Sequence, residues 1–323
     1  MESIKMKSVR KLAAVAVLAG TSAFASFAEA NQPAVIYEAF HSIQYLPLYV
    51  GIDQGIFAKH GVDLKLMTAG SGAQAVAAVI GGHADFSLQD PMTAVLAHIK
   101  GAPITNIGLV VAGVPVWIIA PPSANLHSET DLKGKTVSTA MPPSTTTYLL
   151  QQLIKDKGIQ GVNLSTVQLG TELSPLGVGR AQAATVYEPQ VDQGIASGYK
   201  IVYSFNDKYQ GEFAFSAIDA LQSTIKSKPE MVKNFIEGLA EAEKVIHNSP
   251  DIARQVAIKE FPTLDAKVVT NAVDRLAKNN IYAVDPYISE GAFNNAINVQ
   301  QYIGNIKPGQ VTYADVVHNI YKK

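Results

Sequence analysis

Hydrophobic and polar positions follow two alternating periods in the N-terminal part of the chain. Residues 35–40 are mainly β-branched and aromatic, which predicts a strand. Apolar residues then recur at helical spacing over residues 46–60, and a strict apolar-polar alternation follows in residues 62–66. The stretch 35–67 therefore predicts one βαβ unit. Its first loop would open at the carboxyl edge of a parallel sheet, where open α/β sheets bind their ligands.

A similar order of elements occurs twice. Gly82-His-Ala-Asp-Phe leads through a polar pair to Pro91, and Gly179-Arg-Ala-Gln-Ala leads through Tyr187 and Glu188 to Pro189. Both segments predict a strand, a short loop and a helix that starts at or near the proline. The repetition indicates two lobes of similar plan that share a cleft. In the first loop, Asp90 is expected to cap the helix, and Gln89 is the better candidate for ligand contact.

The first thirty residues have the pattern of a secretory signal peptide. A basic head is followed by an apolar run over residues 12–27 and by Ala28-Glu29-Ala30, a small-x-small site. The run is short for a membrane span and has no stop-transfer flank. We expect cleavage after Ala30 and export of the remaining chain. A retained amphipathic anchor is the alternative.

Composition excludes several functional classes. The chain has no cysteine, so it forms no disulfide and no thiolate metal site. Only 16% of residues are charged and the net charge is −1, so there is no basic field for nucleic acid. The seven histidines are scattered, and no metal cluster, cofactor motif or catalytic motif stands out. About 290 residues after the signal peptide predict two domains of ordinary size.

Two polar loops are candidate ligand contacts. Gly70-Ser71-Gly72 enters a helix and would offer backbone N–H groups to an anion, although it could equally be a plain turn. Ser144, Thr145, Thr146 and Thr147 stand at the start of another helix. Capping needs one hydroxyl, and here there are four, so we expect Ser144, Thr145 or Thr146 to contact ligand. Trp117 either stacks on a ligand or fills the core.

The phrase LYVGIDQGIFAKHGVDLKL, residues 48–66, resembles the start of solute-binding proteins of ABC importers for nitrate, sulfonates and taurine, a group that includes binders of thiamine-pyrimidine precursors. The DLKGK phrase at residues 131–135 resembles the opening of that group's second lobe. The resemblance implies an α/β, type II periplasmic binding protein with two doubly wound sheets joined by a two-strand hinge. Lobe 1 would comprise residues 31–117 and 214–323, and lobe 2 residues 118–213.

The resemblance also implies where ligand would bind. Tyr187 and Glu188 fall where the second lobe of this group commonly contacts its ligand, although Glu188 could instead be a helix-start charge. The C-terminal helices would pack on lobe 1 without contacting ligand, with Arg254 and Arg275 at solvated positions. The full set of expected ligand-binding residues is His41, Tyr45, Gly70, Ser71, Gly72, Gln89, Trp117, Ser144, Thr145, Thr146, Tyr187 and Glu188.

The implied function is capture of a small molecule in the periplasm and its delivery to an ABC permease, by a monomer without cofactor or metal. The absence of a lipobox cysteine favours a free periplasmic protein. The hydroxyl-rich helix start favours a small organic anion, and the tyrosines leave an aromatic heterocycle as the alternative. A pyrimidine synthase of thiamine biosynthesis shares the opening phrase, but Tyr45 stands in place of its histidine and its cysteine motif is absent. We therefore expect no enzyme activity.

Overall fold

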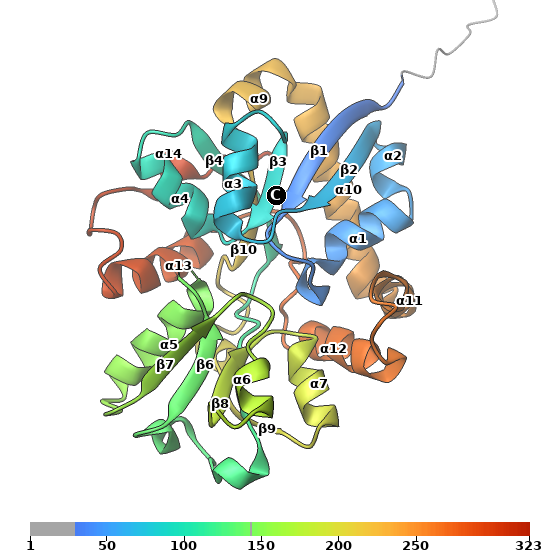
Figure 1. Ribbon diagram of the computed structural model, residues 1–323. Helices are drawn as coiled ribbons and strands as arrows, with labels where there is room; N and C mark the ends of the chain where they lie inside the picture. Colours follow the sequence, from blue (N-terminus) through green and yellow to red (C-terminus); the bar gives the residue numbers. More distant parts are fainter. Residues whose placement is uncertain (1–29, 143) are drawn as a thin grey trace, which may run out of the picture. The chain divides into compact units, whose positions relative to one another are not determined.

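The computed structural model describes residues 30–142 and 144–323, and residues 31–323 form one compact unit. The predicted signal peptide, residues 1–30, lies outside the described residues except for Ala30. Two five-stranded sheets form the framework of the unit (Figure 1).

The first sheet has the strand order β2-β1-β3-β10-β4. Strands β1, β2 and β3 are parallel, and β10 runs antiparallel to β3 and β4. The strands are β1 (Gln32–Glu38), β2 (Val62–Thr68), β3 (Phe86–Gln89), β4 (Ile104–Val111) and β10 (Ser216–Leu221).

The second sheet has the strand order β7-β6-β8-β5-β9. Strands β6, β7 and β8 are parallel, and β5 runs antiparallel to β8 and β9. The strands are β5 (Trp117–Ala120), β6 (Thr136–Ala140), β7 (Asn163–Val167), β8 (Ala183–Val186) and β9 (Lys200–Ser204).

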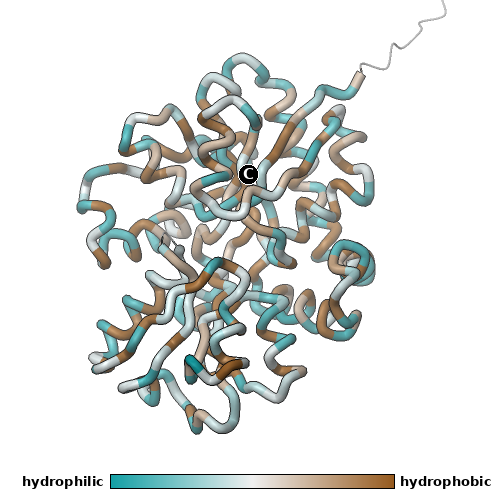
Figure 2. Tube along the Cα trace, viewed as in Figure 1, coloured by the Kyte–Doolittle hydropathy of each residue, from teal (hydrophilic) through white to brown (hydrophobic). Residues whose placement is uncertain are grey.

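The two sheets share one plan, three parallel strands followed by one antiparallel strand and an edge strand. The antiparallel strand makes each sheet mixed, where the sequence pattern alone predicted parallel sheets. Every residue of β3, β4, β5 and β8 is buried, because helices cover these strands on both faces, and Figure 2 shows hydrophobic residues along the central strands. The predicted two-lobed α/β fold class is confirmed.

The helices lie between and around the strands. The longer ones are α1 (Leu46–Asp53), α3 (Gly72–Ile80), α4 (Pro91–Ile99), α5 (Thr145–Asp156), α7 (Gln190–Ala196), α10 (Pro229–Asn248), α11 (Pro250–Glu260), α12 (Ala266–Lys278) and α13 (Glu290–Tyr302). The shorter ones are α2 (Ile56–Lys59), α6 (Ser174–Gly177), α8 (Asn206–Tyr209), α9 (Gln222–Ser227), α14 (Tyr313–Val316) and the 3₁₀ turns η1 (Ile43–Tyr45), η2 (Pro122–Ala124) and η3 (Glu129–Leu132).

The helix predicted over residues 46–60 is interrupted. Gly55 adopts a left-handed backbone with φ of +65°, which ends α1 and redirects the chain into α2. Phe57 of α2 then stacks on Phe235 of α10, which in turn stacks on Phe86 of β3 at 4.2 Å between ring centroids. This stack fastens α10 and α2 to the first sheet.

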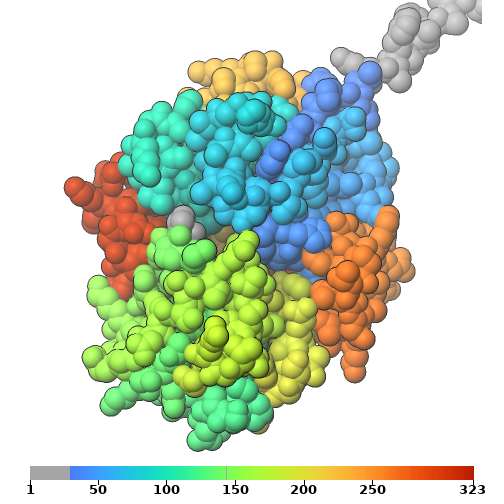
Figure 3. Space-filling view, viewed as in Figure 1, coloured from blue at the N-terminus to red at the C-terminus, as the bar shows by residue number. Residues whose placement is uncertain are grey.

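The C-terminal helices contact elements of both sheets. Helix α11 packs on α1, which belongs to the first βαβ unit, whereas α12 packs on α7, which follows β8 of the second sheet. Helix α13 packs on α5. Figure 3 shows the orange segment that contains α11 and α12 lying against blue N-terminal residues and against the yellow α7. The C-terminal helices therefore contact elements of both sheets, whereas the sequence pattern predicted that they would pack on the first lobe alone.

Candidate functional site

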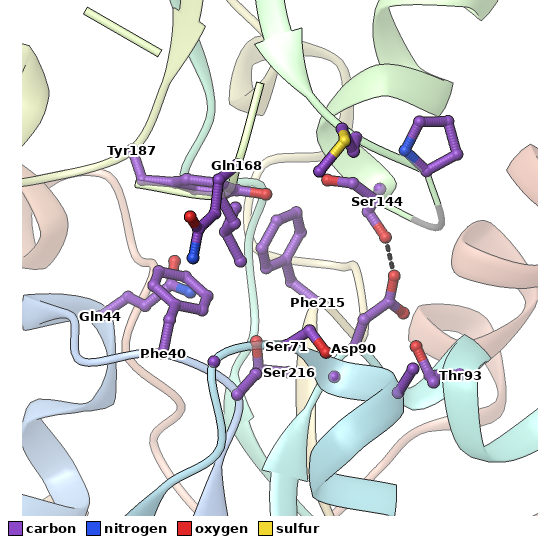
Figure 4. Close-up of a pocket in the computed structure, with 18 of the residues that line it drawn as sticks. Phe40, Gln44, Ser71, Asp90, Thr93, Ser144, Gln168, Tyr187, Phe215 and Ser216 are labelled. Carbon is purple, nitrogen blue, oxygen red and sulfur yellow. Dashed lines mark hydrogen bonds between the residues drawn. The ribbon is translucent and has the colours of Figure 1, made fainter. Parts of the chain in front are cut away.

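A cavity of about 230 Å³ lies where the carboxyl ends of strands from both sheets meet (Figure 4). One wall comes from the loops after β1, β2 and β3, and the other from the loops after β6, β7 and β8. The segment that leads into β10 closes it from behind with Phe215 and Ser216. Strand-end loops of α/β sheets are the usual place for a ligand.

The first residue beyond the strand lines the cavity in five of the six parallel strands. These residues are Ala39 after β1, Asp90 after β3, Met141 after β6, Gln168 after β7 and Tyr187 after β8. A chain that leaves a strand must turn at the sheet edge, and its first free side chain projects beyond that edge. The positions of the strand ends therefore decide which side chains a ligand would meet.

Aromatic rings make up one side of the cavity. The ring of Phe40 lies 5.5 Å from that of Tyr45 and 5.7 Å from that of Tyr187, and Tyr187 lies 5.9 Å from Phe215. Burial raises the pKa of Tyr187 and of Tyr45, so both phenols stay neutral at physiological pH. The tyrosyl hydroxyl of Tyr187 pairs with Thr146. The four rings form an apolar wall suited to a flat molecule.

Asp90 lies on the other side of the cavity (Figure 4). It caps α4 as the sequence predicted, since its Oδ1 accepts the backbone N–H of Met92 at 2.9 Å. Its Oδ2 accepts the hydroxyl of Thr145, the first residue of α5 on the opposite wall. Burial raises the pKa of Asp90 to about 6, although these two hydrogen bonds oppose the shift. The carboxylate is therefore mostly ionised above that pH.

The charge of the cavity wall is negative. Asp90 is the one acidic residue among the described residues that line it, and no lysine, arginine or histidine of the described residues lines it. Gln44 adds a carboxamide that is 1% exposed, and its Oε1 has no hydrogen-bond partner among the described residues. The cavity thus combines an apolar wall, one carboxylate and one free amide oxygen.

Seven of the predicted ligand residues line this cavity. They are Tyr45, Gly70, Ser71, Gly72, Ser144, Thr145 and Tyr187. The Ser71 side chain accepts the N–H of Gln74 and so caps α3, whereas Ser144 makes no capping bond at α5. The Ser144 hydroxyl donates to Thr146 at 3.1 Å, so its oxygen keeps its capacity to accept a hydrogen bond at the cavity wall.

Three further predicted residues are used inside the protein. Thr146 is fully buried and turns to the hydroxyl of Tyr187 behind the cavity wall. Gln89 belongs to β3, so its side chain packs within the sheet and donates to Asp219 of β10. Trp117 is 2% exposed within β5, where it serves the core.

His41 and Glu188 lie outside the cavity. His41 stacks on Phe261 at 4.5 Å and contacts Glu38 at 3.1 Å, in a separate surface groove. Glu188 is buried beside α12, where its Oε1 accepts a hydrogen bond from Arg275 Nε at 2.7 Å. Each residue faces away from the cavity because its neighbour in the loop, Phe40 or Tyr187, already faces it.

The expectation that Arg275 is solvated is wrong. Its guanidinium bridges Glu188 and Asp192, with 2.9 Å to Asp192 Oδ1, and its side chain is 25% exposed. Burial lowers the pKa of Arg275, but the hydrogen bond to Asp192 and the charge of Glu188 outweigh it and raise the pKa overall. Arg254 does sit at the surface, paired with Asp251 and Asp274.

Sequence reasoning missed several cavity residues. The polar ones, other than Asp90, are Gln44, Thr93, Gln168 and Ser216, and the apolar ones include Phe40, Met141 and Phe215. Met141 and Gln168 are the first residues after β6 and β7, so finding them requires the exact strand ends, which the sequence pattern placed one or two residues away. Phe215 and Ser216 carry no such signal, because Phe215 directly precedes the antiparallel strand β10 and Ser216 begins it, so neither follows a parallel strand.

The family model described as NMT1/THI5 like matches residues 42–253, which is more than half of the chain. The chain belongs to the NMT1/THI5-like family. The predicted resemblance to this group of solute-binding proteins is confirmed at the level of family and fold.

Relatives of this NMT1/THI5-like protein carry different names. YtlA of Bacillus subtilis (strain 168), named as a candidate binding protein, is 24% identical over 88% of this chain and 86% of its own. A 4-amino-5-hydroxymethyl-2-methylpyrimidine phosphate synthase of Legionella pneumophila is 22% identical over 68% of this chain and 71% of its own. The alkanesulfonate-binding protein SsuA of Xanthomonas axonopodis pv. citri, bound to MOPS, superposes with a TM-score of 0.74 at 14% identity and covers 89% of this chain and 98% of its own.

Two further findings concern the described part of this family member. None of its helices there is both long and apolar enough to cross a membrane. Residues 30–142 and 144–323 contain no group of three or more histidine, aspartate or glutamate side chains arranged to hold a metal ion.

Proposed function

We propose that this protein is the substrate-binding component of an ABC importer, which captures a small solute in the cavity and delivers it to a permease from the periplasm. The observation that carries the proposal is the cavity at the strand ends of both sheets, in a fold shared with a sulfonate-binding protein. Enclosure between two walls suits capture and release, because relative motion of the walls opens and closes the site. A monomer is sufficient for this role, since one chain supplies both walls.

The proposed lobes are residues 31–117 with 214–323, and residues 118–213. Their support is that each sheet draws its strands from one of these sets, apart from Trp117, which begins β5 one residue before the boundary. The chain passes twice between the sheets, over residues 112–116 and 205–215. These two segments are the proposed hinge.

An aromatic solute is favoured over the small organic anion that the hydroxyl-rich loop had suggested. Four rings line the cavity, and a sulfonate or carboxylate would meet no cationic side chain among the described lining residues. Buried or half-buried anions need charge partners or several donors. Backbone amides at a helix start can supply donors. At the start of α5, however, the hydroxyl of Thr145 already donates to the Asp90 carboxylate, which stands where a ligand anion would bind.

The alternative function is that of an enzyme like the Legionella synthase. No nucleophilic lysine, histidine or cysteine from the described residues lines the cavity, and Tyr45, at the place of the synthase histidine, is 1% exposed. The synthase group uses that histidine and a cysteine motif, and this chain has Tyr45 at the place of the histidine and no cysteine in its sequence. This difference supports binding without turnover.

The test is thermal unfolding of the purified protein against sulfonates, carboxylates, nitrate, pyrimidines and aromatic amines. A ligand at a hundred times its Kd should add ~2.7 kcal/mol to the free energy of unfolding. Gly72→Leu should weaken or abolish the shift, because Gly72 lines the cavity and a Cβ there lies 3.1 Å from Gln89 Oε1 and 3.4 Å from Thr93 Oγ1, so a larger side chain crowds this part of the wall. Gly177→Leu is the matched control, since nothing lies within 4 Å of its Cβ position.

Three results would contradict the proposal. They are no shift across the whole panel, a shift that Gly72→Leu leaves undiminished, and conversion of any compound into a product that chromatography detects.

A further inference from the structure

The Asp90 carboxylate stands at the starts of two helices. It accepts the Met92 N–H at the start of α4 and the Thr145 hydroxyl at the start of α5. The N-terminal end of a helix carries a partial positive charge and free N–H groups, and it therefore attracts an anion. Here the chain supplies that anion itself. A ligand anion would have to compete with Asp90 for the same positive ends.

No cationic side chain neutralises this carboxylate. Asp90 forms no ion pair with any described residue, and no described lysine, arginine or histidine lines the cavity. A carboxylate has about four acceptor positions, and the structure fills two of them. Leaving the rest unfilled in a half-buried site is unfavourable. A ligand with a hydrogen-bond donor would remove that cost.

The surroundings add more negative charge. Glu172 is fully buried outside the cavity lining, where Gln190 donates to it at 3.0 Å, and burial raises its pKa; its charge, when ionised, acts on Tyr187 as that of Asp90 does. Like charges at close range disfavour one another. An anionic ligand would therefore meet repulsion from Asp90, and from Glu172 wherever that group is ionised. A neutral donor or a cation would meet attraction.

We propose that the ligand presents an N–H donor, neutral or protonated, to the Asp90 carboxylate while its ring packs against Phe40, Tyr187 and Phe215. This inference rests on the proposed function, since it assigns the ligand chemistry of the same cavity. Figure 4 shows Asp90 and the Phe40–Tyr187 pair on opposite sides with Phe215 between them, so one small molecule can meet both. Aryl amidines and amino-substituted heteroaromatic rings meet both requirements. Aryl carboxylates and sulfonates meet only the ring requirement.

The experiment compares three probes with the same ring: benzamidine, benzamide and benzoate. Their affinities for the purified protein are measured by calorimetric titration at pH 7.5. We expect benzamidine to bind at least ten-fold more tightly than benzoate, with benzamide between them. Asp90→Asn should weaken benzamidine about ten-fold and should not weaken benzoate, because it removes the charge and keeps the shape.

Asp265→Asn is the matched control. Asp265 caps α12 through the N–H groups of Lys267 and Val268, so the substitution changes a capping aspartate of the same kind outside the cavity. Asparagine caps helices about as well as aspartate, which keeps both variants folded. The control should leave the benzamidine-to-benzoate ratio as in the unaltered protein.

The inference is overturned if benzoate binds more tightly than benzamidine, or if Asp90→Asn leaves their ratio unchanged. It is equally overturned if none of the three binds while a sulfonate, a carboxylate or nitrate from the wider panel stabilises the protein. That last result would keep the proposed function and reject only the ligand chemistry. Silence of the whole panel would instead reject the proposed function itself.

Discussion

The loops after β3 and β8 contain the same order of residue types, and they present opposite members of their polar pair to the cavity. In Gln89-Asp90-Pro91 the second residue faces the cavity, and in Tyr187-Glu188-Pro189 the first does. The reason is where each strand ends. Strand β3 includes Gln89, whereas β8 ends at Val186. In both loops the residue that contacts the cavity is the first one past the strand.

The residue of each pair that points away from the cavity has a different partner in each loop. Gln89 lies in the sheet and donates to Asp219, while Glu188 turns outward to Arg275 of α12. Glu188 has a guanidinium partner, and Asp90 has none among the described residues. Of two acidic residues that each precede a proline, Glu188 therefore has a cationic partner, whereas Asp90 accepts only the Met92 N–H and the Thr145 hydroxyl. The following substitutions separate these roles.

The largest effect is expected for Arg275→Met, which should lower the free energy of unfolding by roughly 3 kcal/mol. The substitution leaves Glu188 and Asp192 buried without their cation, and breaking one side of a buried pair is costly. Urea denaturation measures the loss. Arg254→Met is the control, because its partners are exposed and a much smaller loss is expected. Equal losses for the two variants would show that the bridge to Glu188 has no special weight.

The lack of a cationic partner for Asp90 should make the free energy of unfolding depend on pH. Burial raises its pKa to about 6 in the folded protein, above the ordinary value of 3.8, so the folded state holds the proton over a range where the unfolded state has lost it. Stability that Asp90 contributes is then present below about pH 4 and is lost as pH rises through 6. Between pH 4 and pH 7.5, the free energy of unfolding of Asp90→Asn should therefore rise by about 2 kcal/mol relative to that of the unaltered protein.

Comparing the two proteins at each pH isolates Asp90. Burial also raises the pKa of Glu172, Glu188, Asp219 and Glu243, and these groups are common to both proteins; only Asp219, whose pKa the Asp90 charge also raises, should shift when that charge is removed. A difference in stability that stays constant from pH 4 to pH 7.5 would show that Asp90 titrates normally. The Asp90 carboxylate would then be fully stabilised within the folded protein in the absence of any ligand.

Gln89→Met should cost about 1.5 kcal/mol in the free energy of unfolding without changing ligand selectivity. Methionine keeps the length of the side chain but removes the amide that donates to Asp219 in the sheet, where only Ser87 then remains as a donor. Gln168→Met, at the exposed mouth of the cavity, is the control for stability. A changed preference between benzamidine and benzoate in Gln89→Met would mean that Gln89 acts on the ligand after all.

The sequence was sufficient for the fold because its signals are local and repeated. Strands, helix starts and the doubled loop pattern are set by side-chain periodicity and by prolines, and these fixed the two-sheet plan. The sequence identified cavity residues only in loops that directly follow a parallel strand. An error of one residue in the end of β3 moved the expected contact from Asp90 to Gln89, because successive residues of a strand point to opposite sides.

The remaining contacts depend on elements distant in the chain. Arg275 reaches Glu188 across 87 residues of sequence, and Phe215 enters the cavity from the connection into β10. Neither helix periodicity nor a loop motif in the sequence predicts such a contact. The role of Asp90 as the anion at two helix starts likewise requires knowing that α5 lies opposite α4.

The smallest effect is expected for substitutions of Tyr187, in the aromatic wall of the cavity. Tyr187→Leu keeps apolar volume but removes the ring that lies against Phe40 and Phe215, so an aromatic ligand should bind about 1 kcal/mol more weakly. Tyr187→Phe removes only the hydroxyl, which pairs with Thr146 rather than with the cavity, and should bind as the unaltered protein does. Tyr203→Leu, in β9 away from the cavity, controls for loss of a tyrosine. If the phenylalanine variant loses affinity and the leucine variant does not, the cavity recognises its ligand by hydroxyl groups on this side too. The division between an aromatic wall and an Asp90 wall would then fail.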